Sequence, residues 1–408
     1  MKNTNNIFLF HLRSYNDTDH ITPVIDYFIK KKERVHVLYL SKFDYDKDYR
    51  IQHLQKSPLF SVSRVNIVYK IRKHILFNRY LIFLVEKFKI ISVIHYLLRT
   101  IWVNNYLKKA KACIFEWSDS GVINLRESKL NRIPTICLPH GYTTYTNMDL
   151  NEHIESIKYK TGNWPDHSDR NKFDSYVVQT NRHKKLNLSW GLNEKTINII
   201  GSARFCKEWS EFNLSLLKKF AVKKCSRNQL KVLFFLPQWD YKANYSETIK
   251  VIKKISNNSN IFLVIKGNTR EDMEGSLFRE ELISLEKSKN VIVNSFVHSP
   301  SLIRWSDVVI NIASSIALEA FIQDRPIINP FYLHRNKTIF DNAELVNLAS
   351  GCEEVISLLK NHYEGKKKLF LPNKDFLKQF FINEVYGGKK SNEVLKTYFD
   401  HIVNCESY

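Results

Sequence analysis

The sequence predicts an α/β protein with two doubly wound domains, each built from a parallel sheet covered by helices. Three observations lead to this prediction. The chain has 408 residues, which is too many for one ordinary hydrophobic core. Apolar runs typical of buried strands alternate with amphipathic helical segments, as expected for βαβ units. This alternation stops near residue 207 and starts again near residue 231, so the chain contains two such series.

The first series contains six predicted strands, which lie at 6–12, 35–40, 112–117, 135–141, 176–180 and 197–202. These segments are short and apolar, which favours buried strands. Helices are predicted between them, for example at 22–33 and 181–190. The basic segment 207–227 is predicted to be a helical connector to the second series.

The second series has predicted strands at 231–237, 261–267, 290–296, 308–313 and 326–331. Helices are predicted between and after these strands at 246–256, 275–287, 299–305 and 314–323. Residues 374–405 are predicted to form two helices around the turn Tyr386-Gly-Gly-Lys-Lys. We therefore predict Rossmann-like domains at 1–227 and 228–385, and a helix at 386–408 that packs back on the N-terminal domain. Two such domains facing a central cleft and closed by C-terminal helices form the GT-B architecture.

The chain carries a large positive net charge of +21, from 62 lysines and arginines against 41 acids. Such an excess indicates nucleic acid, an anionic membrane surface or anionic substrates as partners, or else a lysine-rich surface that reflects genome composition. The sequence contains no zinc-finger spacing and no aromatic RNA-binding motif, so we do not expect nucleic acid as a partner.

Targeting and redox signals favour a cytoplasmic protein. The six cysteines show no CxxC spacing, which is typical of reduced thiols rather than of disulfides or a zinc site. The N-terminal segment lacks the features of a signal peptide. Residues 80–103 are strongly apolar but contain five ionisable side chains, which argues against a transmembrane helix. This segment is predicted either to be a buried helix or to lie on the inner face of the cytoplasmic membrane.

Polar residues that follow predicted strands are the candidate binding residues, because ligands of doubly wound sheets bind at the carboxyl ends of the strands. In the segment SDVVINIASSIALEAFIQDRPII, Ser314 and Ser315 follow a strand and Glu319 lies one helical turn further on. A helix N-cap explains one of the serines. A nucleotide explains all three residues, because the helix N-terminus binds phosphate and the carboxylate accepts hydrogen bonds from a ribose. The pattern therefore favours a nucleotide site.

Two further strand ends carry cations that suit phosphate groups. Lys266, Asn268 and Arg270 lie in IFLVIKGNTR, where the alternative to a diphosphate site is a solvated turn. Arg204 lies in INIIGSARFCKEW, where it is expected either to reach a phosphate or to brace Glu208.

The predicted catalytic residues belong to the first domain. Glu116 and Asp119 lie close together in the segment ACIFEWSDSG, and one carboxylate of such a pair can act as a general base. His140 follows the next strand, between a proline and Gly141 that are expected to aim its ring at the cleft between the domains. The alternative for His140 is a structural role without chemistry.

A family resemblance becomes visible in these segments as a set. FEWSD, LPHG, VVQTNRHKKLNLSWG, IIGSARFCKEW, LVIKGNTR and SDVVINIASSIALEAFIQDRPII resemble segments of bacterial surface-carbohydrate biosynthesis proteins, related to capsule, Kdo and CDP-glycerol-type transferases. The resemblance covers residues 110–330 and implies a GT-B transferase that binds its acceptor in 1–227 and its nucleotide sugar in 228–385. Where these families carry His-Pro, this chain has Asn268-Thr269, which leaves open whether the donor is CMP-, CDP- or UDP-linked.

The predicted function is therefore a glycosyltransferase that moves a sugar from a nucleotide-activated donor to a capsule, lipopolysaccharide or teichoic-acid-like glycan. The expected acceptor is a glycan or a lipid-linked glycan, with peripheral contact to an anionic membrane. No cofactor is expected, and no required metal, since no DxD-type motif stands out. Two alternatives remain open: a nucleotide-sugar 2-epimerase of the same architecture, and a non-catalytic scaffold that binds glycan or anionic lipid.

Overall fold

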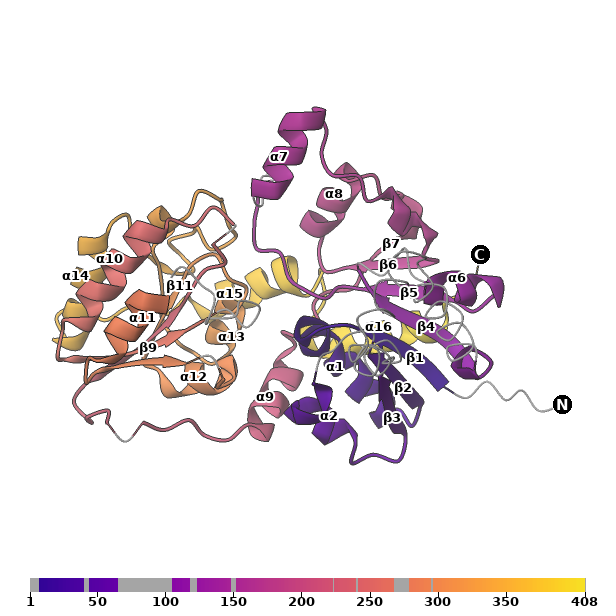
Figure 1. Ribbon diagram of the computed structural model, residues 1–408, viewed down its shortest axis with the longest axis horizontal. Coiled ribbons are helices and arrows are strands. Elements are labelled where there is room, and N and C mark those ends of the chain that lie inside the picture. Colours follow the sequence, from indigo (N-terminus) through magenta and orange to yellow (C-terminus); the bar gives the residue numbers. More distant parts are fainter. Residues whose placement is uncertain are drawn as a thin grey trace, which may run out of the picture. The chain divides into compact units, whose positions relative to one another are not determined.

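The computed structural model describes residues 7–39, 44–64, 105–117, 123–147, 152–222, 224–239, 241–267, 279–294 and 296–407. These residues form two compact units, each built on its own parallel sheet (Figure 1). Unit 1 comprises Met1–Tyr142, Asp166–Trp209 and Ile382–Tyr408, and unit 2 comprises Thr143–Pro165 and Ser210–Phe381. The predicted α/β fold with two doubly wound sheets is confirmed.

The sheet of unit 1 has seven strands in the order β3-β2-β1-β4-β5-β6-β7, all parallel. Their bounds are β1 Ile7–Leu12, β2 Arg34–Tyr39, β3 Phe60–Arg64, β4 Ala110–Glu116, β5 Thr135–Leu138, β6 Ser175–Val178 and β7 Ile197–Ile199. The chain moves outward from β1 in one direction and then, from β4 on, in the other. This reversal is the switch point at which doubly wound sheets bind ligands.

The helices of unit 1 are α1 Tyr15–Lys30, α2 Tyr49–Leu54, α6 Ile123–Leu130, α8 Asn181–Ser189 and α16 Ser391–Val403. Helix α1 begins well before the predicted residue 22, because Ser14 and Asp17 form a capping box at its N-terminus and the helix accommodates Pro23. Helix α9 (Lys207–Leu216) is shorter than the predicted connector of 207–227.

The C-terminal segment of the chain returns to unit 1, where α16 packs against α1 (Figure 1). Gly201 makes this approach close: its φ is +106°, and a Cβ at this position would lie 2.8 Å from the backbone of Tyr386. The amide of Ser202 donates to the carbonyl of Val385 at 2.8 Å, and the hydroxyl of Tyr398 donates to the carbonyl of Gly201 at 2.7 Å.

The sheet of unit 2 has six parallel strands in the order β10-β9-β8-β11-β12-β13, which is the Rossmann order 3-2-1-4-5-6. Their bounds are β8 Leu230–Phe235, β9 Ile261–Lys266, β10 Val291–Asn294, β11 Val308–Asn311, β12 Ile327–Asn329 and β13 Asn347–Leu348. The central strands are buried on both faces, as expected for a parallel sheet between two helical layers.

The helices of unit 2 are α7 Glu152–Thr161, α10 Tyr245–Ser256, α11 Arg279–Glu286, α12 Ser299–Trp305, α13 Ala317–Ile322, α14 Cys352–Tyr363 and α15 Lys374–Phe380. Among the described residues, no helix is both long enough and apolar enough to cross a bilayer. The predicted membrane-facing or buried helix at 80–103 lies outside the described residues.

Candidate functional site

Three neighbouring strands of unit 1 lead into ionisable side chains. Strands β1, β4 and β5 are adjacent and parallel, and Glu116 of β4 lies opposite Leu138 of β5. Arg13 follows β1 directly, Glu116 is the last residue of β4, and His140 lies two residues after β5. Because the carboxyl ends of parallel strands meet at one edge of the sheet, these three side chains come together.

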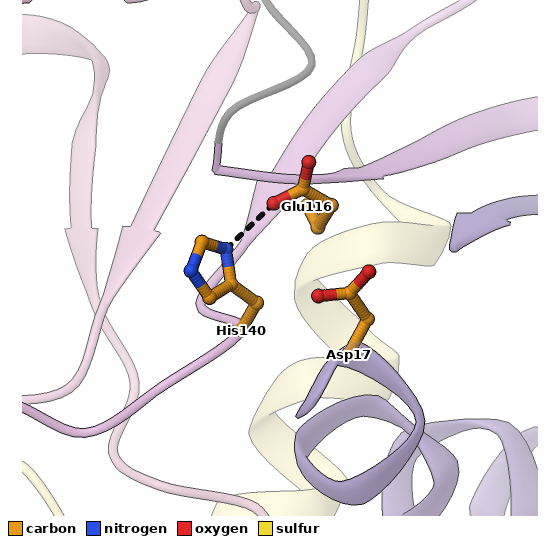
Figure 2. A group of neighbouring side chains, drawn as sticks. All are labelled: Asp17, Glu116 and His140. Carbon is orange, nitrogen blue, oxygen red and sulfur yellow. Dashed lines mark hydrogen bonds and ion pairs between the residues drawn. The ribbon is translucent and has the colours of Figure 1, made fainter. Parts of the chain in front are cut away.

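The central contact of this group joins a buried carboxylate to an imidazole. Nδ1 of His140 lies 2.6 Å from Oε2 of Glu116, and Figure 2 shows the two side chains facing each other. The Glu116 side chain is fully buried, whereas that of His140 is 28% exposed. A carboxylate that accepts a hydrogen bond from Nδ1 fixes the tautomer and the orientation of the ring. Nε2 is then the ring nitrogen that can accept a proton from a substrate.

Arg13 contacts the other oxygen of the same carboxylate. One of its terminal guanidinium nitrogens, Nη2, lies 2.5 Å from Oε1 of Glu116, and its side chain is 40% exposed. An isolated charge is costly to bury, so the fully buried Glu116 depends on both of these partners. The arrangement places a carboxylate, an imidazole and a partly exposed cation at one edge of the sheet.

Asp17 of α1 completes the group and positions Arg13. Its carboxylate accepts hydrogen bonds from the backbone amides of Arg13 at 2.6 Å and Ser14 at 2.8 Å. Burial raises the pKa of Asp17, and the negative charge of Glu116 raises it further, although these hydrogen bonds oppose the shift. Arg13 and Asp17 were not among the residues predicted for the site, although Arg13 directly follows a predicted strand.

Asp17, Glu116 and His140 are also the side chains of this edge that could hold a metal ion (Figure 2). Each offers one ligand atom, and these atoms lie within 4.8 Å of one another. Both carboxylate oxygens of Glu116 already contact Arg13 or His140, and Oδ2 of Asp17 accepts hydrogen bonds from the amides at the start of α1. Metal independence stays a prediction.

The other residues predicted for this domain have separate positions. Asp119 lies outside the described residues, and so does its predicted pairing with Glu116. Arg204 lies 2.6 Å from Oδ2 of Asp19 and thereby links the segment after β7 to α1. Glu208, which Arg204 was expected to brace, accepts a hydrogen bond from the hydroxyl of Ser391 at 2.5 Å. The structure therefore unites Glu116 with His140, which were predicted as separate candidates for the base.

In unit 2, Lys266 ends β9 at the carboxyl edge of the sheet. The residue is only 3% exposed, and this burial lowers the pKa of Lys266 to about 8. A buried ammonium gains more from an anionic ligand than an exposed one, because water no longer screens the interaction. Asn268 and Arg270, the other predicted residues of this loop, lie outside the described residues.

The loop after β11 has an unusual backbone. Ala313 adopts a φ of +54°, which is uncommon for a residue with a side chain. The hydroxyl of Thr144 donates to the carbonyl of Ala313 at 2.7 Å, and the side-chain amide of Asn311 donates to the carbonyl of Ser314 at 2.9 Å. These hydrogen bonds hold the loop that carries the two predicted serines.

The helix that follows this loop begins later than the two serines predict. Helix α13 starts at Ala317 with Ile316 in the N-cap position, so neither serine caps it in the usual way. Ser314 instead accepts a weak hydrogen bond from the amide of Ile316 at 3.4 Å. Glu319 lies in the first turn of α13 and is 6% exposed. Strand β8 separates β9 from β11, so the sheet holds Lys266 and this loop two strands apart on the same edge.

Comparison with solved structures shows that the fold is shared along nearly the whole chain. The UDP-GlcNAc 2-epimerase of Methanocaldococcus jannaschii has a TM-score of 0.58 at 12% identity, with 97% of this chain and 99% of that chain covered. The UDP-N-acetylglucosamine 2-epimerase of Rickettsia bellii gives 0.55 at 14% identity, with 97% and 96% covered. HepE of Anabaena, solved with UDP and glucose, gives 0.56 at 10% identity, with 97% and 98% covered. No family model and no curated protein sequence matches the chain.

These neighbours correct the function predicted from the sequence. The predicted activity was a glycosyltransferase acting on a surface glycan, whereas the neighbours from M. jannaschii and R. bellii are UDP-GlcNAc 2-epimerases. The glycosyltransferase prediction is therefore wrong, and the 2-epimerase alternative is the better supported of the two. At these identities the likeness itself shows a GT-B-like fold of two Rossmann-like sheets.

Proposed function

We propose that this protein is a nucleotide-sugar 2-epimerase, which inverts the configuration at C2 of a sugar carried on a nucleoside diphosphate. The observation that carries the proposal is the pair of Glu116 and His140 at the switch point of unit 1. The likeness to UDP-GlcNAc 2-epimerases over both units supports it, and it makes UDP the expected nucleotide. Neither a second sugar acceptor nor a redox cofactor is part of this reaction.

The chemistry explains why an accessible base is needed. C1 of a nucleotide sugar is an acetal carbon, so no carbonyl group acidifies the hydrogen on C2. The proton can be lost if the bond from C1 to the diphosphate oxygen breaks, so that a C1–C2 double bond forms and the nucleoside diphosphate leaves. Return of a proton to the opposite face of C2, with re-formation of the bond from C1 to oxygen, gives the epimer. All atoms are conserved, and nothing is oxidised or reduced.

The geometry of unit 1 fits the proton-transfer part of this reaction. His140 accepts the C2 proton on Nε2, while Glu116 accepts the hydrogen bond from Nδ1 and stabilises the imidazolium that forms. The 28% exposure of His140 lets a substrate reach the ring, and the complete burial of Glu116 keeps water from competing for the carboxylate. Arg13, which is 40% exposed, adds a positive charge beside the reacting group.

The nucleotide is assigned to the strand ends of unit 2. Lys266 provides a buried ammonium for the diphosphate, and Glu319 provides a buried carboxylate for the ribose hydroxyls. Ser314 and Ser315 lie between Lys266 and Glu319 in the sequence, and they supply hydroxyl and amide donors for phosphate oxygens. Arg204 pairs with Asp19 in unit 1, and its role in this proposal is to position α1.

The test is conversion of UDP-GlcNAc without an acceptor. Purified protein, with a chelator present, is expected to form UDP-N-acetylmannosamine, which proton NMR resolves by the coupling at C1. His140→Gln is expected to lower the turnover number by about 10²–10⁴-fold, because the side chain can no longer take the proton. His167→Gln, which changes a histidine packed on Trp190 elsewhere in unit 1, serves as the matched control. Failure to convert any UDP-, CDP- or GDP-linked sugar would reject the proposal.

A further inference from the structure

The segment that follows α14 presents apolar side chains to water. Tyr363 is 38% exposed, Phe370 37% and Leu371 48%. Exposed lysines flank them, at positions 360, 366, 367, 368 and 374. We refer to residues 360–374 as the basic–apolar segment. Single exposed apolar residues need no explanation, but three large ones within one short lysine-rich segment suggest a partner.

The backbone of the segment is fixed, so this exposure is built into the fold. The amide of Leu369 donates to Nδ1 of His362 at 3.0 Å, which folds the segment back on the last turn of α14. Asn347 exchanges two hydrogen bonds with the backbone of Phe370, both at 3.2 Å. Leu369 is buried in the hydrophobic core of unit 2, and Pro372 is also buried. Phe370 and Leu371 therefore project outward between two anchored residues.

The charge of the segment is strongly positive. Residues 360–374 contain five lysines and one glutamate, which give a net charge of +4 with His362 neutral. Glu364 lies 2.5 Å from Lys366 and 4.0 Å from Lys360, and the hydrogen bond from Lys366 lowers the pKa of Glu364. A single carboxylate compensates only a small part of this charge, so the surface attracts anions.

We infer that the basic–apolar segment binds the surface of an anionic lipid bilayer. Lysines at the level of the headgroups gain electrostatic energy from anionic lipids, while aromatic and aliphatic side chains gain by entering the boundary with the acyl chains. A soluble polyanion would satisfy the lysines but would leave Phe370 and Leu371 in water. A second copy of the chain would bring two surfaces of charge +4 together, which repel each other. Of these three partners, lipid is the one that accounts for both properties of the segment.

Vesicle sedimentation tests this inference with the full-length protein. Vesicles of phosphatidylcholine mixed with phosphatidylglycerol are expected to bind the protein at low salt, while vesicles of phosphatidylcholine alone bind it weakly. Replacement of Lys366, Lys367 and Lys368 by Gln is expected to lower the partition coefficient roughly 100-fold. The double variant Phe370→Ser with Leu371→Ser is expected to lower it roughly 10-fold or more.

Phe296→Ser is the matched control, because Phe296 is 93% exposed in unit 2 but lies outside the basic–apolar segment. It is expected to bind vesicles like the wild type, and melting temperatures identify any variant that fails to fold. Binding that survives both segment variants would overturn the inference. So would a wild type that ignores anionic vesicles at low salt. The wild type and the double serine variant are also compared on a polyphosphate resin. If the two proteins bind the resin equally and also bind vesicles equally, the surface would be reassigned to soluble polyanions.

Discussion

At the carboxyl edge of the unit 1 sheet, buried charges pair with one another. Glu116 contacts both His140 and Arg13. At the carboxyl edge of the unit 2 sheet, burial lowers the pKa of Lys266 to about 8. The contacts among Glu116, His140 and Arg13 fix the geometry of these side chains before a substrate binds, and proton transfer requires such preorganisation. The buried ammonium of Lys266 gains electrostatic free energy when an anion binds beside it, which favours a role in binding phosphate.

The two units are therefore expected to respond differently to substitution. Changes in unit 1 should lower the turnover number while leaving the affinity for UDP intact. Changes in unit 2 should weaken the binding of UDP while leaving turnover at saturating substrate nearly unchanged. A variant that alters both quantities together would break this division of roles.

Glu116→Gln is expected to give the largest effect of the following variants, with a turnover number lowered by about 10²–10⁴-fold. The amide keeps the size of the side chain but cannot stabilise the imidazolium of His140, and its NH₂ group favours the wrong tautomer of the ring. Steady-state kinetics of epimerisation measure the turnover number, and calorimetric titration measures the affinity for UDP.

Asp174→Asn is the matched control for Glu116→Gln. Asp174 is a buried carboxylate of the same unit that accepts hydrogen bonds from Thr135, away from the proposed base. The control should lose stability but keep its turnover number. Full turnover in Glu116→Gln would remove Glu116 from the mechanism.

Lys266→Met is expected to weaken UDP binding by about 1.5–3 kcal/mol, the usual loss for a charge-assisted hydrogen bond. In the wild type, the UDP affinity should fall as the pH rises above about 8, because Lys266 then loses its proton in the free protein. The methionine variant should lack this fall. Lys250→Met, which changes an exposed lysine of α10, is the control. Equal UDP affinities of Lys266→Met and the wild type would contradict the assignment.

The same substitution should change stability in a predictable direction. Burial holds the pKa of Lys266 below its ordinary value of 10.5, so the unfolded chain binds this proton more tightly than the folded protein. The free energy of unfolding of the wild type should therefore rise with pH between about 8 and 10.5. Lys266→Met should lose this rise and be more stable than the wild type at pH 7. Chemical denaturation at several pH values measures both effects.

Glu319→Gln is expected to have the smallest effect, a loss of about 1–3 kcal/mol in nucleotide affinity with a nearly unchanged melting temperature. The buried carboxylate in the first turn of α13 is assigned to the ribose, and the amide preserves its packing. Glu247→Gln, in the first turn of α10, is the matched control. A large drop in melting temperature with unaltered UDP binding would instead give Glu319 a structural role.

Much of the fold could be predicted because buried parallel strands leave a strong apolar signal. Strands β3 and β13 were missed for physical reasons: β3 is an edge strand in which Ser61 and Ser63 interrupt the apolar run, and β13 has only two residues. The start of α1 was also missed, although the capping residues Ser14 and Asp17 can be read in the sequence.

The candidate site was predictable only in part, because strand ends identify residues but not their partners. Glu116 and His140 were both predicted, yet their hydrogen bond depends on the register that places β4 beside β5. Arg13 follows a strand and the same rule would have found it. Asp17 has no such signal, since it reaches this group through the capping of α1.

The most direct test of the account is the fate of the C2 hydrogen in heavy water. UDP-GlcNAc is incubated with the wild type in D₂O, and proton NMR measures the deuterium at C2 in both recovered substrate and product. If His140 removes the C2 proton, the product should carry deuterium at C2, and His140→Gln should abolish its incorporation. Epimerisation that retains the original hydrogen at C2, or deuterium incorporation that His140→Gln leaves unchanged, would contradict the account.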